Sequence, residues 1–325
     1  MESKREEIAK KLDKFAFNIK NIDRIIAFMV ALFIIFAVVV YSKKNAEVMQ
    51  QEAAYNRMLA ELQAHQLNVI YANVTPNNGE IDGTKQKEAP MFTDGVEATA
   101  FAFEQLYNST SYETYGYGNT HAEALGQNVE VIMSFKSVKF EDGSYFDENV
   151  RIETQTNFGQ TEAIQLFWKD GKKYKRGGSR PRQENGTCVA DFNGGFYQVN
   201  TSLTSKARIE VRRETIQFCK DFSFARDKSG RITYYKTTVL LDKVKAVETY
   251  GKNIQEEGGT TFPIFSQLQV SCIIDRNGNL LSYTTNEIMT VTKKVVIDIS
   301  PVMNTETTNF IKSINQTPTV PYPTF

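Results

Sequence analysis

Apolar residues run without a break near the N-terminus, from Ile25 to Tyr41. These seventeen residues include no charge, amide or proline, and basic residues flank them on both sides. As a helix with a rise of about 1.5 Å per residue, they would extend roughly 26 Å, close to the hydrocarbon thickness of about 30 Å. The pattern predicts one transmembrane helix over 25–41.

The charges beside the predicted span set its orientation. Residues 1–24 carry seven Lys and Arg residues, whereas Lys43, Lys44 and Arg57 are the nearest basic residues after the span. This asymmetry predicts a single-pass protein of the cell membrane with a cytoplasmic N-terminus and an extracytoplasmic C-terminal domain. A cleaved signal peptide is the alternative, but its apolar region is usually about 7 to 15 residues long and follows a short basic segment. The longer leader and apolar run favour an uncleaved anchor.

The leader, residues 1–24, has its own apolar stripe. Helical spacing places five apolar side chains on one side: Ile8, Leu12, Phe15, Ile19 and Ile22. Such an amphipathic helix could lie at the membrane surface, with neighbouring lysines contacting anionic lipid. Contact with a helix of another envelope protein explains the stripe equally well.

The residues after the span also have a helical composition. Residues 42–72 are rich in Glu, Gln, Ala and Leu and contain neither Gly nor Pro, which predicts a helical stalk. Val48, Tyr55, Leu62 and Val69 recur every seven residues, as in a weak coiled coil that could bind other envelope proteins. A helix that continues the membrane span and packs on the domain is the alternative.

Two segments lack any apolar period. Residues 73–92 collect Gly, Pro, Asn and charge, which predicts a linker. Residues 315–325 contain three of the eight prolines of the chain and predict a flexible, extended tail.

Residues 93–314 form the predicted folded domain. Asp94 would cap a helix of about four turns, and long aromatic-rich strands follow it. Four glycine-containing turns separate these strands, at Asp142-Gly143, Asp170-Gly171, Lys228 to Gly230 and Asn277-Gly278. Short connections of this kind join antiparallel strands. The predicted fold class is therefore α+β, with an antiparallel sheet and a few helices.

Weaker signals concern the end and the middle of this domain. Pro301 and the polar residues after it predict a short final helix within 301–314. A Gly-rich region near 177–205 could join two halves, each built from hairpins.

Charge and cysteine content narrow the functional classes. Lys and Arg number 38, as do Asp and Glu, so the chain lacks the strongly positive face of a nucleic-acid binder. Three cysteines, Cys188, Cys219 and Cys272, allow at most one internal disulfide, and free thiols are the simpler interpretation. Cys272 alternates with apolar neighbours and is predicted to be buried.

Catalytic motifs are nearly absent. The two histidines, His65 in the stalk and His121 in a polar segment, have no second ligand or nucleophile nearby in sequence. The chain contains no paired-cysteine, phosphate-loop or paired-carboxylate motif, and the glycine of Asp275 to Asn279 is misplaced for a calcium loop. We therefore expect no cofactor, no metal and no catalytic site.

The densest charged run is Lys169 to Arg182, with seven basic residues against one acidic residue in fourteen positions. It could bind lipid headgroups, a wall polymer or an acidic partner. Alternatively, its lysines protect the edge of a hairpin from pairing with other chains. The seven candidate anion-binding residues are Lys169, Lys172, Lys173, Lys175, Arg176, Arg180 and Arg182.

Three segments carry a resemblance to a known superfamily. FAFEQLYNSTSYETYGYG at 101–118, IQLFWKDGKKYKRG at 164–177 and CIIDRNGNLLSYTTNEIMTV at 272–291 resemble the helix and long strands of the LolA/LppX-like lipoprotein carriers. The resemblance implies a curved, half-barrel-like sheet that wraps space for an apolar ligand beside helices. Those carriers are soluble or lipid-anchored, so the predicted membrane span argues against long-range shuttling.

The layout of leader, span, stalk and exterior domain is also similar to the bitopic, NTF2-like assembly components of type IV secretion and conjugation machines. Those components are scaffolds. We expect a non-catalytic, membrane-anchored binding or scaffold component of a cell-envelope assembly. A tethered lipid- or lipoprotein-handling module is the alternative, and an envelope hydrolase comes third. A carrier should enclose a continuous apolar cavity, whereas a scaffold should have a filled core and an exposed patch.

Overall fold

The computed structural model describes residues 42, 46, 49, 52–62, 88–124, 127–154, 160–294 and 298–324. The predicted leader and membrane span lie outside these residues. Within the described part of the chain, no helix has both the length and the apolar character that a membrane crossing requires. The chain divides into two compact units, Met1–Ala54 and Tyr55–Phe325. The described residues of the first unit are helical.

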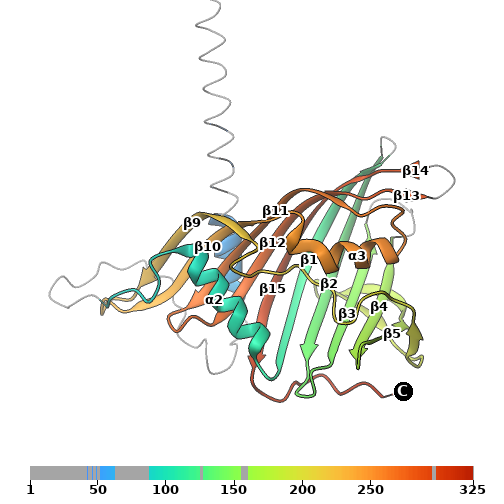
Figure 1. Cartoon of the computed structure of the whole chain (residues 1–325), viewed down its shortest axis with the longest axis horizontal. Coiled ribbons are helices and arrows are strands. Elements are labelled where there is room, and N and C mark those ends of the chain that lie inside the picture. Colours follow the sequence, from blue (N-terminus) through green and yellow to red (C-terminus); the bar gives the residue numbers. More distant parts are fainter. Residues whose placement is uncertain are drawn as a thin grey trace, which may run out of the picture. The chain divides into compact units, whose positions relative to one another are not determined.

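The second unit is built on one sheet of eleven strands, all paired antiparallel (Figure 1). The strand order is β8-β5-β4-β3-β2-β1-β15-β12-β11-β10-β9. In chain order, the strands are β1 (Tyr112–Ala124), β2 (Gln127–Lys139), β3 (Tyr145–Glu153), β4 (Glu162–Lys169), β5 (Lys172–Gly177), β8 (Tyr197–Val199), β9 (Ile216–Arg226), β10 (Ile232–Leu241), β11 (Ile264–Asp275), β12 (Leu280–Thr290) and β15 (Val302–Ile314).

Smaller elements complete the unit. Helix α2 (Gly95–Asn108), the 3-10 turn η1 (Lys245–Val247) and helix α3 (Glu248–Glu256) lie on one face of the sheet, here called the front face (Figure 1). The opposite face is called the back face. Two further hairpins pair separately, β6 (Ser179–Glu184) with β7 (Thr187–Asp191), and β13 (Lys293–Lys294) with β14 (Asp298–Ile299).

The structure confirms the local signals that combine a turn with flanking apolar alternation. The Asp94 side chain accepts a hydrogen bond from Val96 N–H and caps α2. All four predicted glycine turns join neighbouring strands: β2 to β3, β4 to β5, β9 to β10 and β11 to β12. At Asp170-Gly171 both residues have positive φ, 51° and 70°, as a two-residue hairpin requires. The predicted antiparallel sheet is therefore present.

The predicted final helix within 301–314 is wrong, because residues Val302–Ile314 form strand β15. This strand pairs with β1 on one side and with β12 on the other. Both β1 and β12 form backbone hydrogen bonds with β15, and its β-branched and aromatic residues favour a strand. β15 thereby joins the meander β1 to β5 to the meander β9 to β12 in one continuous sheet.

Helix α3 shows how strongly the sheet curves. Its Tyr250 hydroxyl donates to Glu287 on β12, and its Asn253 accepts from Lys173 on β5. In strand order β12 and β5 are six steps apart, roughly 29 Å along a flat sheet. Tyr250 and Asn253 are only one helical turn apart, so the front face must curl toward α3. The front face is therefore concave, as the half-barrel prediction required.

Glycines at the centre of the sheet accommodate this curvature. Gly116 and Gly118 occupy front-face positions of β1, in the middle of the sheet. A Cβ atom at Gly116 would overlap the Phe135 ring and the Thr308 carbonyl oxygen, and one at Gly118 would overlap the Glu306 carbonyl oxygen. Glycine lets the strands bend toward the front without these overlaps.

The main hydrophobic core lies between α2 and strands β9 to β12 on the front face. Buried residues of α2, including Val96, Phe103 and Leu106, pack there with buried residues of the strands such as Val270 and Leu280. Thr99 of α2 bonds to Thr237 of β10 through the two hydroxyls, which lie 2.7 Å apart. This half of the front face is therefore filled by side chains.

The back face carries the last turns of the predicted stalk. Tyr55, Met58, Leu59 and Leu62 are buried there, in a cluster that includes Phe310. The Tyr55 hydroxyl donates to the Thr237 carbonyl oxygen at 2.7 Å. For residues 55–62 the structure agrees with the alternative in which the stalk packs on the domain, and the coiled-coil positions Val48 and Val69 lie outside the described residues.

The predicted linker is described only at its end. Glu88 N–H donates to the Gly230 carbonyl oxygen, and the Phe92 side chain is buried in the main core. Residues 88–92 therefore attach to the domain directly before α2.

The cysteines are free thiols, in agreement with the simpler prediction. Cys272 is buried in the main core as expected. Cys188 is buried on β7, because the β6-β7 hairpin folds back over the sheet and packs it beside Val150 and Ala163.

Candidate functional site

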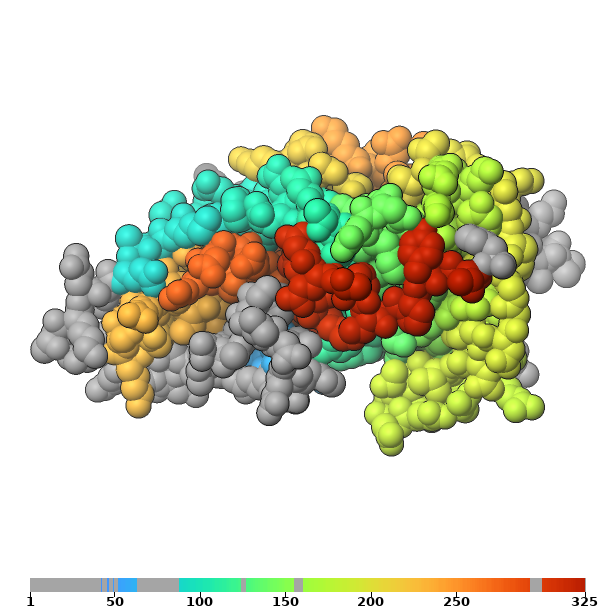
Figure 2. Space-filling model, turned by 90° about the horizontal axis from the view of Figure 1, so that it is seen from below, coloured from blue at the N-terminus to red at the C-terminus, as the bar shows by residue number. Residues whose placement is uncertain are grey.

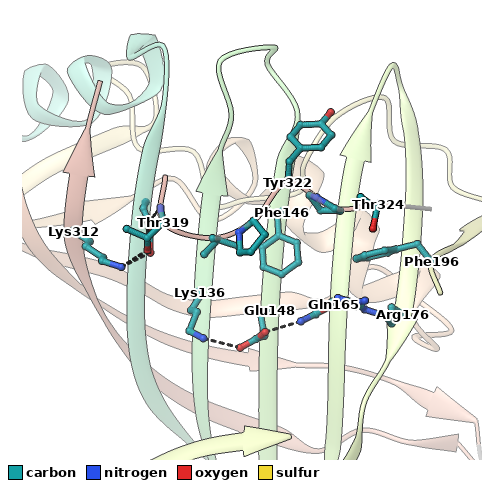
Figure 3. A pocket seen from close by; sticks show the side chains of 14 residues that line it. Lys136, Phe146, Glu148, Gln165, Arg176, Phe196, Lys312, Thr319, Tyr322 and Thr324 are labelled. Atoms are coloured by element: carbon teal, nitrogen blue, oxygen red, sulfur yellow. Dashed lines mark hydrogen bonds and ion pairs between the residues drawn. The ribbon is translucent and has the colours of Figure 1, made fainter. Parts of the chain in front are cut away.

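A cavity of about 510 Å³ opens on the back face, between strands β1 to β5 and the C-terminal residues 319–324 (Figure 3). A chain of polar side chains forms its floor. Lys136 donates to Glu148, Gln165 donates to Glu148 on the other carboxylate oxygen, and Arg176 donates to Gln165. The Arg176 guanidinium also stacks over the Phe196 ring, 4.5 Å from its centroid. The charged groups of this floor thus already have partners.

The C-terminal tail forms one wall of this cavity and lies across the sheet (Figure 2). The buried Glu113 carboxylate accepts hydrogen bonds from Thr319 N–H, at 2.7 Å, and from Lys312 Nζ, at 2.7 Å. The Tyr322 ring packs against Phe140, and its hydroxyl donates to Asp142 at 2.6 Å. The tail has no regular secondary structure, but these contacts attach it to the sheet, which corrects the prediction of a flexible segment.

Burial raises the pKa of Glu113, but the hydrogen bonds from Lys312 and Thr319 outweigh this effect, and the net pKa lies below its usual range. The same balance holds for Asp142, whose pKa is lowered by bonds from Ser144 and Tyr322 against the effect of burial. Both carboxylates are therefore ionised acceptors at neutral pH and hold the tail in place.

The predicted basic run is divided by the alternation of strand β5. Lys169, Lys172 and Arg176 occupy back-face positions, whereas Lys173 and Lys175 occupy front-face positions. Two residues, Arg180 and Arg182, lie on the separate β6-β7 hairpin.

Several of these side chains have acidic partners. Lys169 lies 3.8 Å from Asp142, Lys175 lies 3.8 Å from Glu162, and Arg182 lies 2.9 Å from Asp191. No single surface holds all seven residues.

The apolar membrane-surface residues Ile8, Leu12, Phe15, Ile19 and Ile22 lie outside the described residues. So does His65, whereas His121 lies on β1 with its Nδ1 atom 3.8 Å from Glu130. Among the described residues, no three His, Cys, Asp or Glu side chains come together as metal ligands would.

The concave front of β2 to β4 presents a second candidate surface. Apolar side chains that share this face are shielded from solvent: Val129, Val131, Met133, Ile164 and Trp168. None of them belongs to the four hydrophobic clusters that the described residues form. These side chains are therefore buried without being part of a packed core, in contrast to the residues under α2.

Small and polar residues form the centre of the same face. On β1 and β15 the front-face positions are occupied by Gly116, Gly118, Thr120, Thr305 and Thr307. The Thr120 and Thr305 hydroxyls bond to each other at 2.9 Å. An apolar wall on β2 to β4 thus adjoins a narrow polar strip, and an amphipathic ligand would match this combination.

Helix α3 covers this region through polar contacts. Lys173 Nζ donates to Asn253 at 2.7 Å and lies 3.3 Å from Glu257, the residue that ends the helix. Glu256 accepts from the Ser202 backbone N–H at 2.7 Å. Of the residues of α3, only Gly251 is fully buried. Tyr250 and Ile254 of α3 pack in part against the main core, and polar contacts attach its other side to β5 and residues 201–202.

Glu287 is the most unusual titratable group of the front face. Its side chain is 4% exposed, its Oε1 accepts from Tyr250, 3.0 Å away, and its Oε2 has no hydrogen-bond partner among the described residues. Burial raises the pKa of Glu287 to about 7, although the Tyr250 hydrogen bond opposes this shift. Burial, and then the neighbouring Glu287 carboxyl, raises the pKa of Tyr250 well above its usual value.

The sequence prediction missed Glu287, Tyr250 and Trp168 as candidate site residues. Glu287 lies four positions after Tyr283 and two positions before Met289 on β12. In a strand these three side chains share one face, so the alternation indicates an acid on the buried side. No local signal places Tyr250 beside it, because that contact depends on the curvature of the sheet.

No protein-family model matches the chain, and no curated protein matches its sequence. The structure is similar to LprF from Mycobacterium bovis, with a TM-score of 0.31 and 11% identity, over 71% of this chain and 98% of that chain. A DUF1329 family protein from Desulfovibrio piger has a TM-score of 0.25 and 10% identity, over 66% and 92% of the two chains.

A domain described as an outer membrane lipoprotein-sorting protein, from Vibrio parahaemolyticus, has a TM-score of 0.22 and 11% identity, over 69% and 92% of the two chains. The resemblance to lipoprotein carriers stated from the sequence is accompanied by similarity to this one lipoprotein-sorting domain, at a low TM-score.

Proposed function

We propose that the domain binds an amphipathic, lipid-like ligand in the concavity of its sheet and acts as a tethered lipid- or lipoprotein-handling module without catalysis. One observation carries the proposal. The front-face side chains of β2 to β4, such as Val131 and Trp168, are buried but belong to no packed cluster. A concave apolar surface outside the main core favours an apolar guest.

The cover over this surface supports the proposal further. Polar contacts at its rim attach α3 to β5 and β12, and such contacts exchange readily with water. A ligand could therefore enter when the polar contacts between α3 and β5 open. A scaffold that acts through a rigid exposed patch has no need for such a cover, so a lipid- or lipoprotein-handling module, and not a scaffold, is our main proposal.

The tether remains part of the proposal. The predicted span over 25–41 would hold the domain at the cell membrane, and residues 55–62 pack on its back face. The concave face and the attachment to the stalk therefore lie on opposite faces of the sheet. We propose that the module accepts or delivers its ligand close to the membrane that holds it.

Trp168, the single tryptophan of the chain, provides a direct test because it lies on the front face of β4. The full chain in peptidiscs would be titrated with a monoacylglycerol that carries bromine atoms on its acyl chain. Bromine quenches tryptophan fluorescence only on contact. We expect saturable quenching of Trp168.

A pair of variants on one strand supplies the control. Val131→Phe adds volume on the front face and should weaken quenching, whereas Ile132→Phe adds the same kind of side chain on the back face and should leave it unchanged. Absence of quenching in the wild-type protein, or equal effects of the two variants, would overturn the proposal.

A further inference from the structure

Two acceptor oxygens of the front face are buried without a hydrogen bond. These are Glu287 Oε2 on β12 and Asn149 Oδ1 on β3, and neither has a partner among the described residues. Most buried polar atoms in proteins are hydrogen-bonded, and an unpaired one costs about 1–3 kcal/mol. Two such atoms on one concave face suggest that a missing molecule supplies their donors.

Both acceptors belong to the front face of the sheet. Tyr250 of α3 donates a hydrogen bond to Glu287. The positive charge of Arg151 on β3 acts to lower the pKa of Tyr250, against the larger effect of burial. Arg151 and Asn149 are two positions apart on β3 and therefore point to the same face. Asn149 is also paired in register with Ile164 of the apolar wall. The polar acceptors and the apolar wall thus border one region.

The charges around this region leave Glu287 as its unmatched group. Arg151 lies 3.9 Å from Glu162, and Lys173 lies 3.3 Å from Glu257, so both cations have acidic partners. Glu287 has no ion pair within the described part of the chain and bonds only to Tyr250, a neutral phenol at physiological pH. The group that would complement Glu287 is therefore a hydrogen-bond donor.

We propose that the ligand's polar end carries hydrogen-bond donors, a hydroxyl or an ammonium group, and that Glu287 and Asn149 receive them. This inference rests on the proposed function and specifies the head of the amphiphile. A ligand with an ionised carboxylate head is disfavoured, because it offers no donor and meets the unpaired Glu287 carboxyl.

Three probes that each have a ten-carbon chain test this selectivity: decylamine, monodecanoylglycerol and decanoate. Each would be used at pH 8 to displace the brominated monoacylglycerol from the full chain, and recovery of Trp168 fluorescence reports the displacement. We expect decylamine and monodecanoylglycerol to bind at least about tenfold more tightly than decanoate, as hydrogen bonds to a charged or buried acceptor predict.

Variants assign the effect to its residue. Glu287→Gln should reduce decylamine binding about tenfold or more and leave decanoate binding unchanged or improved. Glu306→Gln, an acid on the back face of the neighbouring strand β15 that pairs with Arg57, is the matched control and should leave all three affinities unchanged. Asn149→Leu should weaken monodecanoylglycerol binding independently of Glu287.

The pH dependence separates the two kinds of donor. The pKa of Glu287 near 7 means that its carboxyl ionises between pH 6 and pH 8, so decylamine affinity should rise over this interval while monodecanoylglycerol affinity stays nearly constant. Equal binding of the three probes to the wild-type protein would overturn the inference and leave the proposed function intact. Failure of every amphiphile, including the brominated probe, would overturn the proposed function instead.

Discussion

Two helices cover the same concave face, and they are attached in opposite ways. Seven residues of α2 are buried, and its Phe103 and Leu106 side chains belong to the main core. Helix α3 buries only Gly251 completely. Its Tyr250 and Ile254 are partly buried against the same core, and hydrogen bonds join the helix to Lys173, Glu287 and residues 201–202. Apolar burial therefore stabilises α2 more than α3, which depends to a larger extent on polar contacts.

The difference indicates a division of labour within one sheet. The half of the front face under α2 is a core that must stay packed, and the half under α3 is a surface that can be uncovered. Local opening is expected where buried apolar contacts are few and polar contacts are exposed. Four measurements test this difference between the two halves of the sheet.

The largest effect is expected in α2. Phe103→Ala should lower the free energy of unfolding by about 3–5 kcal/mol, because it removes a ring from a packed core and leaves a cavity. Ile254→Ala, a half-buried position of α3, is the matched control and should cost less than about 2 kcal/mol. Urea denaturation of the full chain, followed by Trp168 fluorescence, gives both values. Similar losses for the two variants would contradict the comparison.

The buried carboxyl under α3 should make stability depend on pH. Because the pKa of Glu287 is raised from 4.5 to about 7 in the folded protein, the folded state binds more protons than the unfolded state between these values. Stability should therefore fall by about 3 kcal/mol as pH rises from 4.5 to 7 and stay low above that range. Glu287→Gln should remove this contribution. An unchanged pH profile in the variant would show that another group is responsible.

The tail on the back face is also attached through a buried carboxylate, Glu113. Glu113→Gln should cost about 1–2 kcal/mol, since it removes a charged acceptor from Lys312 and Thr319. The Thr319 amide should then exchange its hydrogen faster than in the wild-type protein. Because the pKa of Glu113 is lowered in the folded state, acid should weaken the same contacts as the pH falls through that pKa.

Glu306→Gln is the control for the tail experiment. It removes a partly exposed ion pair with Arg57 and should change stability by less than about 1 kcal/mol, without effect on exchange of the Thr319 amide. Equal exchange rates of this amide in the two variants would mean that Glu113 does not hold the tail.

The smallest global effect is expected at the rim of α3. Lys173→Met should lower global stability by about 1 kcal/mol or less, because its partners Asn253 and Glu257 become accessible to water. Hydrogen exchange should nevertheless accelerate in α3 and stay unchanged in α2. Faster exchange in both helices would mean that they open as one unit.

Much of the fold was predictable where the determining residues are neighbours in the chain. Asp94 and the glycines at positions 143, 171, 230 and 278 mark boundaries through their own backbone preferences, and the structure places a cap or a turn at each of them. The sequence predicts a helix in place of β15, because Pro301 and the polar residues after it are typical of a helix start. Its pairing with β1 and β12 outweighs that local preference.

The candidate site was far less predictable. The basic run is dense in the sequence, yet alternation along β5 sends Lys173 and Arg176 to opposite faces. The Pro-rich tail has no pattern that indicates a partner, and its attachment depends on Glu113, roughly two hundred positions earlier in the chain. Such pairings become visible only when the strands are in register.

The hairpin strands with their glycine turns, the capped helix α2 and the expectation of a membrane span could be read from the sequence, because each depends on residues that are near one another in the chain. Only the tertiary structure decided that β1 and β15 join two meanders, that the sheet curls toward α3 and that Glu287 is buried beside Tyr250. The physical reason is that curvature and burial are properties of the whole sheet. Strands β5 and β12 are six steps apart in the sheet, and only a curved sheet brings both within contact distance of α3.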